Sequence, residues 1–136
     1  NVEIAELAGD KNIYTFGKDS ESIIKLYETA GYVSKEYYEN DKEIKRAVDF
    51  ILNPAVVKLG NKTRLERLYN ELLNKDWFMT LIDFNAYVEA KEQILADYED
   101  QDSWNEKVVH NIAKAGFFSS DRTIAQYNAD IWHCEG

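Results

Sequence analysis

Apolar residues recur at helical spacing along most of this 136-residue sequence. Downstream of Asp41, residues Ile44, Ala47, Val48, Ile51 and Leu52 stand at positions i, i+3, i+4, i+7 and i+8. That spacing places them on one face of an α-helix. A single proline and six glycines leave little turn chemistry for a fold of many strands. The sequence therefore predicts a mostly α fold class, with the helices packed as a bundle.

Similar apolar stripes predict helices along the rest of the chain. We expect these helices to begin at capping residues, namely Asp19 or Ser20, Ser34, Thr63 (paired with Glu66), Asp83, Asp102 or Ser103, and Ser119 or Ser120, and a further helix to run from Asp41. An opening helix over residues 2–8 is expected to stop at Gly9, and two others at Gly31 and Gly116. Pro54 is expected to stop or bend the chain.

One short strand is predicted over residues 12–16. From Asn12 to Phe16 the segment is rich in β-branched and aromatic residues, and Gly17 closes it. A single strand cannot satisfy its own backbone hydrogen-bonding groups. We therefore expect this strand to need partner strands that the sequence does not supply.

The charge balance and the length of the apolar runs argue against two classes of partner. The chain has 25 acidic and 16 basic residues, for a formal net charge of −9. Such a surface repels phosphate backbones, so we expect no nucleic-acid partner. No apolar run reaches the length of a membrane span, so no membrane partner is expected either. The single cysteine, Cys134, fits a reducing compartment, which predicts a cytoplasmic location.

An acidic run over residues 97–102 has the look of a calcium-binding loop. The sixth position of such a loop needs glycine for a sharp turn, and Asp102 stands there. The twelfth position needs a bidentate glutamate, and Val108 stands there. We interpret the run as a solvated turn between helices, whose last residues cap the next helix.

Other chemically able residues are sparse. His110, His133 and Cys134 are too few for a zinc site, and Cys134 with His110 would form a nucleophilic pair only if the fold brought them together. We expect no metal site and no catalytic residue. The sequon that starts at Asn61 is explained by Thr63 as a helix cap. The aromatic residues Tyr37, Tyr38, Trp77 and Phe78 are interpreted as core or hinge packing rather than a sugar platform.

Several blocks of sequence resemble one enzyme family. The run from Gly116 to Tyr127, followed by Asp130, Ile131 and Trp132, closely resembles the C-terminal stretch of glycogen and starch phosphorylases, and residues 109–113 resemble the run before it. Residues 1–6, Gly9 and residues 12–17 resemble the piece that follows the pyridoxal-phosphate lysine motif of that family. Gly31, Tyr32 and residues 36–38 also match. The blocks follow the family order and span nearly the whole chain, with nothing distinctive over residues 52–61.

The resemblance implies that residues 1–136 are a single truncated segment from the C-terminal domain of an α-glucan (glycogen/maltodextrin) phosphorylase. Such an enzyme is a two-domain, Rossmann-like glycosyltransferase of the GT-B type. It phosphorolyses the ends of α-1,4-glucan chains to glucose 1-phosphate, using the 5′-phosphate of pyridoxal phosphate as proton donor and acceptor. The implied partners are the missing N-terminal part of the same enzyme, glucan, phosphate and a second subunit of a homodimer.

The family's functional residues have no counterpart in this chain. The resemblance places the lysine that holds pyridoxal phosphate upstream of Asn1, and the basic residues that clamp the substrate phosphate further upstream. We therefore expect no catalytic and no cofactor-binding residue here, and an isolated chain that is inactive. The closing helix, residues 120–132, is expected to brace the N-terminal half of the enzyme.

Two other interpretations remain open at this point. The chain would also fit a stand-alone acidic helical module that binds a protein partner, although the orphan strand argues against it. A small helical enzyme that uses Cys134 and His110 is the third interpretation.

Overall fold

The computed structural model of the chain describes residues 2–134. The chain divides into two compact units. The terminal unit joins the start of the chain, up to Thr15, to the part from Glu92 onward, and the middle unit covers Phe16–Lys91. Helices account for most of the described residues, as the sequence predicts, and no strand occurs among residues 2–134. No helix in that range is long and apolar enough to cross a membrane.

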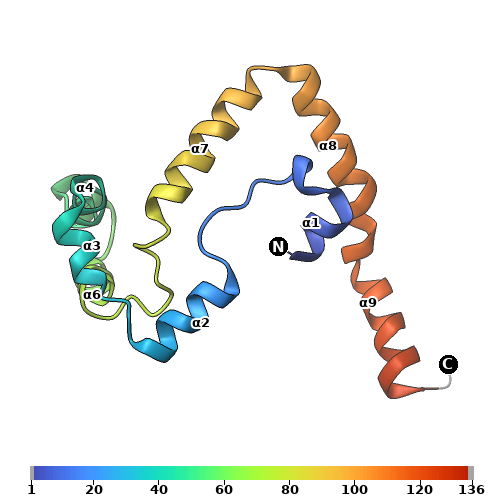
Figure 1. Cartoon of the computed structure of the whole chain (residues 1–136), viewed down its shortest axis with the longest axis horizontal. Coiled ribbons are helices and arrows are strands. Elements are labelled where there is room, and N and C mark those ends of the chain that lie inside the picture. Colours follow the sequence, from blue (N-terminus) through green and yellow to red (C-terminus); the bar gives the residue numbers. More distant parts are fainter. Residues whose placement is uncertain (1, 135–136) are drawn as a thin grey trace. The chain divides into compact units, whose positions relative to one another are not determined.

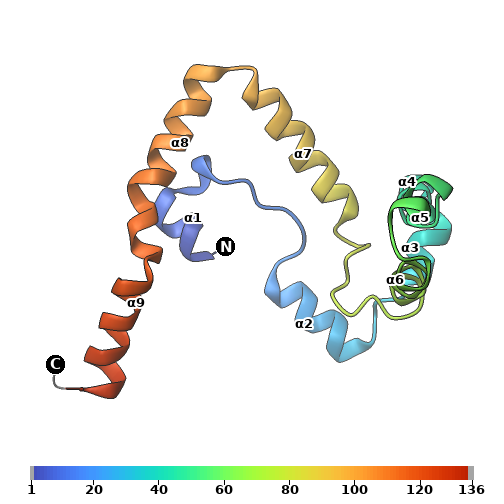
Figure 2. The same cartoon turned by 180° about the vertical axis from the view of Figure 1, so that it is seen from behind.

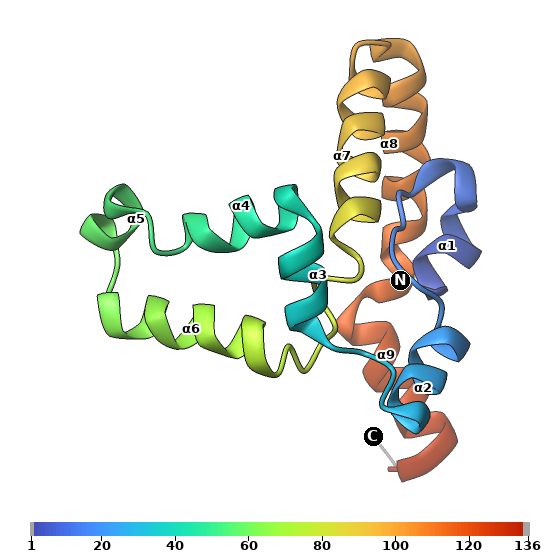
Figure 3. The same ribbon diagram turned by 60° about the vertical axis from the view of Figure 1, so that its left-hand side comes forward.

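The middle unit is a set of short helices around a small core. Its helices are α2 (Ser20–Thr29), α3 (Ser34–Asn40), α4 (Lys42–Phe50), α5 (Pro54–Leu59), α6 (Lys62–Asn74) and the first half of α7 (Phe84–Tyr98). Figure 3 shows α4 and α6 running side by side in opposite directions, joined through α5 at one end and packed on α3 at the other.

The core of the middle unit is built from the stripe that the sequence singles out. Ile44 and Val48 of α4 pack with Leu81, and none of the three is more than 4% exposed. Partly buried side chains from α3, α6 and α7 surround them, namely Tyr37, Tyr38, Tyr69, Leu73 and Phe84. The apolar face that the helical period gives to α4 therefore forms the centre of the core of this unit.

The terminal unit has almost no core of its own. It contains α1 (Val2–Ala8), η1 (Asp10–Asn12), the end of α7, α8 (Gln101–Ala115), η2 (Gly116–Phe118), α9 (Ser120–Tyr127) and the π-helical turn η3 (Asn128–Trp132). Figures 1 and 2 show α1 lying beside α8 from both sides. Among the side chains described in this unit, Ala8 alone is buried. The unit is therefore held mostly by half-buried contacts.

Several predicted helix ends are confirmed. The carboxylates of Asp19 and Asp41 accept backbone N–H groups of α2 and α4, and Ser119 caps α9 in the same way. Gly9 ends α1 with a φ of 84°, in the region that favours glycine. Each of these residues supplies the partner or the conformation that a helix end lacks.

Other predicted caps are wrong because a second polar residue, or a distant partner, takes the position. The hydroxyl of Ser34 donates to the Leu73 carbonyl, so it does not cap α3. Asn61 rather than Thr63 caps α6, and Asp100 rather than Asp102 or Ser103 caps α8. The Asp83 carboxylate instead accepts the backbone N–H of Lys18, at 3.0 Å.

Three predicted helix ends also differ. The left-handed residue after α2 is Ala30, with a φ of 48°, and Gly31 follows it. Gly116 is the residue at which α8 ends, as predicted, but its backbone is right-handed and leads directly into η2. Pro54 occupies the start of α5, where its missing N–H costs nothing, and α4 has already ended at Phe50.

The predicted strand over residues 12–16 is not formed. Asn12 ends η1, and Ile13 has extended backbone angles of −137° and 148°. The segment that follows has no partner strand among residues 2–134. Its residue types favour an extended backbone, but a strand also requires a neighbour to bond with, and the described chain offers none.

Candidate functional site

One polar site of the terminal unit joins three residues from distant parts of the sequence. Tyr14 follows η1, Asp97 is near the end of α7, and Lys107 lies on α8. The Tyr14 hydroxyl donates to Asp97 Oδ2 at 2.6 Å, and Lys107 Nζ donates to the same oxygen and to the Tyr14 hydroxyl, both at 2.6 Å. The side chains of Lys107 and Asp97 are only 24% and 27% exposed. We name this set the Tyr14–Asp97–Lys107 cluster.

Aromatic and amide contacts hold the cluster in place. The Trp104 ring stacks near Tyr14, with a centroid distance of 6.3 Å, and meets Tyr98 edge-on. One turn further along α8, Asn111 donates to the Asn12 carbonyl at 2.7 Å and to the Lys107 carbonyl at 2.9 Å. The segment after η1 is thus tied to α8 at two points.

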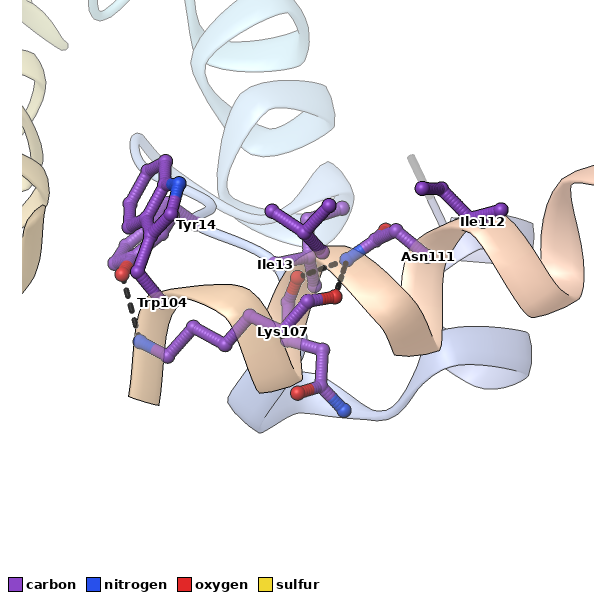
Figure 4. Close-up of a pocket in the computed structure, with 8 residues that line it drawn as sticks. Ile13, Tyr14, Trp104, Lys107, Asn111 and Ile112 are labelled. Carbon is purple, nitrogen blue, oxygen red and sulfur yellow. Dashed lines mark hydrogen bonds between the residues drawn. The ribbon is translucent and has the colours of Figure 1, made fainter. Parts of the chain in front are cut away.

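A cleft of about 350 Å³ lies along this junction (Figure 4). Its lining includes Ile13, Tyr14, Trp104, Lys107 and Ile112. A second cleft, of about 300 Å³, lies between α1 and the later part of α8 and shares Asn111 and Ile112 with the first. Both clefts therefore border the same stretch of α8.

The electrostatics of the cluster fix its protonation. Hydrogen bonds from Lys107, Tyr14 and Gln93 lower the pKa of the Asp97 carboxyl to about 2. The hydrogen bond with Asp97, and then that with Tyr14, raises the pKa of the Lys107 ammonium. Asp97 is therefore ionised and Lys107 protonated at neutral pH. A protonated, paired lysine is a poor nucleophile, so this geometry suits a structural clasp rather than covalent chemistry.

The residues considered for metal or nucleophilic chemistry are not assembled into a site. His110 borders a shallow cleft with Asp102, Glu106 and Val109, and Cys134 is not among its lining residues. Cys134 is exposed and donates its backbone N–H to the side chain of Asn128. No group of three or more metal-ligating side chains occurs within residues 2–134.

The acidic run over residues 97–102 is a turn between α7 and α8. Asp100 caps α8 by accepting the backbone N–H of Ser103 at 3.2 Å, and Asp97 belongs to the cluster described above. A turn between the helices is therefore confirmed, but the cap does not come from the last residues of the run. Asp100 caps α8, and residues 101–102 already belong to that helix.

The four aromatic residues weighed as a sugar platform separate into two pairs. Tyr37 and Tyr38 pack against the core of the middle unit, as the packing interpretation predicts. Trp77 and Phe78 do not, because they are 67% and 91% exposed. For that second pair the prediction of core packing is wrong within the described chain.

The turn that carries Trp77 and Phe78 is strained and well anchored. Asp76 and Met79 have φ values of 36° and 51°, in the left-handed region, which costs roughly 1–2 kcal/mol for each such residue. The buried Asp76 carboxylate accepts the Tyr32 hydroxyl at 2.5 Å and the Leu81 N–H at 2.9 Å. Burial, followed by the bond to Asp76, raises the pKa of Tyr32. The buried carboxylate therefore holds a backbone conformation that the residues alone disfavour.

Large apolar side chains are exposed along the end of the chain. From α8 through η3, five of them are more than half exposed, and we name them the C-terminal apolar set: Val109, Ile112, Ile124, Ile131 and Trp132. Val109 and Ile112 are three residues apart on α8, so these two share a helix face. Exposed apolar surface on this scale is typical of a surface that another part of a protein covers.

The sequence contains no local signal for the two anchored sites. Tyr14 and Asp97 are 83 residues apart, and Tyr32 and Asp76 are 44 apart. The acidic run around Asp97 has a local pattern, but that pattern resembles a calcium-binding loop and not a hydrogen-bonded cluster. Pairings over such distances depend on the fold, which helical periodicity alone does not give.

Comparisons with known proteins agree along the whole described chain. The family model for carbohydrate phosphorylases matches residues 1–134. A maltodextrin phosphorylase of Streptococcus pneumoniae is 65% identical over 133 residues, which is 98% of this chain and 18% of the relative. A Bacillus subtilis glycogen phosphorylase is 40% identical over 97% of the chain and 16% of its own length, and the liver form from Bos taurus is 40% identical over 99% and 16%. The chain thus spans less than a fifth of these relatives.

Proposed function

The chain belongs to the carbohydrate phosphorylase family, and from this premise we propose that it is the C-terminal, structural part of an α-glucan phosphorylase. The whole enzyme would transfer the terminal glucosyl unit of an α-1,4-glucan to phosphate and release glucose 1-phosphate. In this proposal residues 1–136 form one truncated segment of the C-terminal domain of a two-domain GT-B glycosyltransferase. The names of the relatives, which are maltodextrin and glycogen phosphorylases, support a glucan as substrate.

The structural role is supported by the difference in apolar burial between the two units. The middle unit has a buried core, whereas the terminal unit exposes the C-terminal apolar set and buries only Ala8 among its described side chains. Ordering a chain costs conformational entropy that apolar burial has to offset. We propose that the missing part of the same enzyme covers this set, with the closing helical stretch bracing the N-terminal half.

The extended segment after η1 supports the same proposal. Ile13 already has the backbone angles of a strand, and the described chain provides no neighbouring strand. We propose that residues 13–16 add to a sheet of the upstream polypeptide, as the Rossmann-like architecture requires. The Tyr14–Asp97–Lys107 cluster would hold this segment in place from the side of α8.

The cofactor of the proposed enzyme would be bound outside this chain. Pyridoxal phosphate requires a lysine amine that can form a Schiff base. Lys107 lines the cleft of about 350 Å³ beside the cluster, and its ammonium is held protonated by Asp97 and Tyr14. The residues of this cleft therefore do not fit the cofactor. We propose that the lysine lies upstream of Asn1, and that the isolated chain has neither catalytic nor metal-binding residues.

We extend the proposal to the setting of the enzyme. A cytoplasmic enzyme without a nucleic-acid or membrane partner agrees with the net charge of −9 and the single free cysteine. We also propose that the whole enzyme is a homodimer that takes glucan and phosphate as substrates.

The proposal is tested on the full reading frame that contains this chain. We expect a glycine-rich stretch with a lysine upstream of Asn1, and glucose 1-phosphate release from maltoheptaose and phosphate by the encoded protein. The isolated 136-residue chain should release none. A start codon directly before Asn1, with no phosphorolysis by the product, would instead favour the stand-alone interaction module.

A further inference from the structure

The Trp77–Phe78 tip, meaning these two residues and their rings, is an exposed aromatic pair in the middle unit. Phe78 is 91% exposed and Trp77 is 67% exposed, although both residues immediately precede the buried Met79. Exposing two neighbouring aromatic rings to water is unfavourable in free energy, and polar residues could occupy the same turn without that cost. Their exposure therefore calls for a physical reason.

The backbone of the tip is fixed rather than loose. The left-handed residues Asp76 and Met79 flank it on either side, and the Met79 N–H donates to the Asp76 carbonyl at 2.8 Å. Inside the turn, the Asp76 carboxylate binds the Tyr32 hydroxyl and the Leu81 N–H. From α2, the Tyr27 hydroxyl donates to the Trp77 carbonyl at 2.8 Å. Strained residues that are held this firmly are typical of preorganised contact sites.

The polar groups beside the tip are used within the unit. The Tyr27 and Tyr32 hydroxyls and the Asp76 carboxylate bind the turn itself, and Lys75 Nζ lies 3.6 Å from Glu71 on α6. What the tip offers outward is therefore mostly ring surface, together with the indole N–H of Trp77. A sugar would need several polar partners beside the rings, and the hydroxyls of Tyr27 and Tyr32 are already bonded to the turn, so the chemistry favours a largely apolar protein pocket.

We propose that the Trp77–Phe78 tip is a preformed anchor that inserts into an apolar pocket on the part of the same polypeptide that lies outside these 136 residues. This inference rests on the proposed function, in which the chain is part of a longer enzyme. The chain spans only 16% to 18% of the relatives described above, so most of such an enzyme is available to supply the pocket. A second copy of this segment is a poorer occupant, because two surfaces of net charge −9 repel each other. Rigid aromatic residues are the common anchors of protein interfaces.

The test measures how accessible position 78 is in the full-length enzyme. Cys134 is first replaced by serine, and Phe78→Cys is introduced into that background. Its reaction rate with a small maleimide is followed by mass spectrometry of the peptide that contains it, in native protein and in urea. Arg46→Cys is the control, because the Arg46 side chain is 80% exposed and belongs to a surface ion pair. We expect the native Phe78→Cys thiol to react at least tenfold more slowly than in urea, while Arg46→Cys reacts at a similar rate in both.

Three results would overturn the anchor. One is a Phe78→Cys thiol that reacts as fast in native enzyme as in urea. Another is protection that arises only when maltoheptaose is added, which would make the tip a sugar contact. The third is protection that disappears on dilution, which would assign the tip to a contact between copies. Glucose 1-phosphate release is measured on the same samples: fast labelling of an active enzyme contradicts the anchor alone, whereas an inactive wild-type enzyme contradicts the proposed function.

Discussion

At the scale of single residues, one carboxylate helps to attach the segment after η1 to the rest of the terminal unit. Asp97 receives hydrogen bonds from Tyr14 and Lys107, and through them it ties the segment after η1 to α8. Because the pKa of Asp97 is lowered in the folded state, its ionised form is stabilised there relative to the unfolded chain.

The stability contributed by Asp97 should therefore be present at neutral pH and be lost as the pH falls from about 4 towards 2. An NMR titration of the Asp97 carboxyl should give a pKa of about 2. Lys107→Met removes the largest cause of the shift and should move the pKa back up, towards that of a free aspartate. A titration that gives the ordinary value in the wild-type chain would show that the cluster does not form.

The buried Asp76 should be more sensitive to substitution than any surface aspartate. Asp76→Ala leaves the Leu81 N–H and the Tyr32 hydroxyl without their acceptor, which costs about 1–3 kcal/mol for each buried group. Urea unfolding followed by circular dichroism measures the loss. Asp102→Ala, at an exposed position of α8, is the control and should change the free energy of unfolding by less than about 0.5 kcal/mol. Equal effects of the two substitutions would contradict the anchoring role of Asp76.

At the scale of elements, the effect of a glycine on stability depends on whether it stands at the end of a helix or inside it. The residue that ends α2, Ala30, has a φ of 48°, which is strained for a residue with a Cβ atom. Ala30→Gly should therefore stabilise the middle unit by up to about 1 kcal/mol. Ala47→Gly, inside α4, should destabilise it by about 1 kcal/mol. Thermal unfolding of the two variants should shift in opposite directions, and a shift in the same direction would mean that Ala30 is not left-handed in solution.

Helical periodicity predicts most of the long helices, but it misses α5, which begins at Pro54, and it does not show what joins the helices. The stripe of Ile44 and Val48 predicted both α4 and its buried face, because a single face must pack. The cap of α6 was misassigned because Asn61 and Thr63 have similar side chains two residues apart, and only the backbone angles decide between them. The segment after Asn12 was predicted as a strand from residue type alone, although pairing, which the sequence cannot show, decides whether a strand forms.

At the scale of the whole molecule, the exposed apolar side chains predict that the last helices stabilise the proposed full-length enzyme. Deletion of residues 119–136 removes Ile124, Ile131 and Trp132 from the C-terminal apolar set. Each large apolar side chain buried in a partner contributes about 1.5–3 kcal/mol. Differential scanning calorimetry should show a clear fall in the melting temperature, together with lost phosphorolysis. Full activity at an unchanged melting temperature would show that this stretch braces nothing.

The central claim is that this chain supports a phosphorylase without supplying its chemistry. The most direct test is the kcat of the full-length enzyme in which Lys107→Arg, His110→Gln and Cys134→Ser are combined. Arginine keeps the charge beside Asp97 but cannot form a Schiff base, and His110 and Cys134 are exposed, so the fold should tolerate all three changes. We expect a kcat for glucose 1-phosphate release within about threefold of the wild type, because a structural segment contributes no step to the reaction. A hundredfold fall in kcat at an unchanged melting temperature would place catalytic residues within this chain and contradict the account.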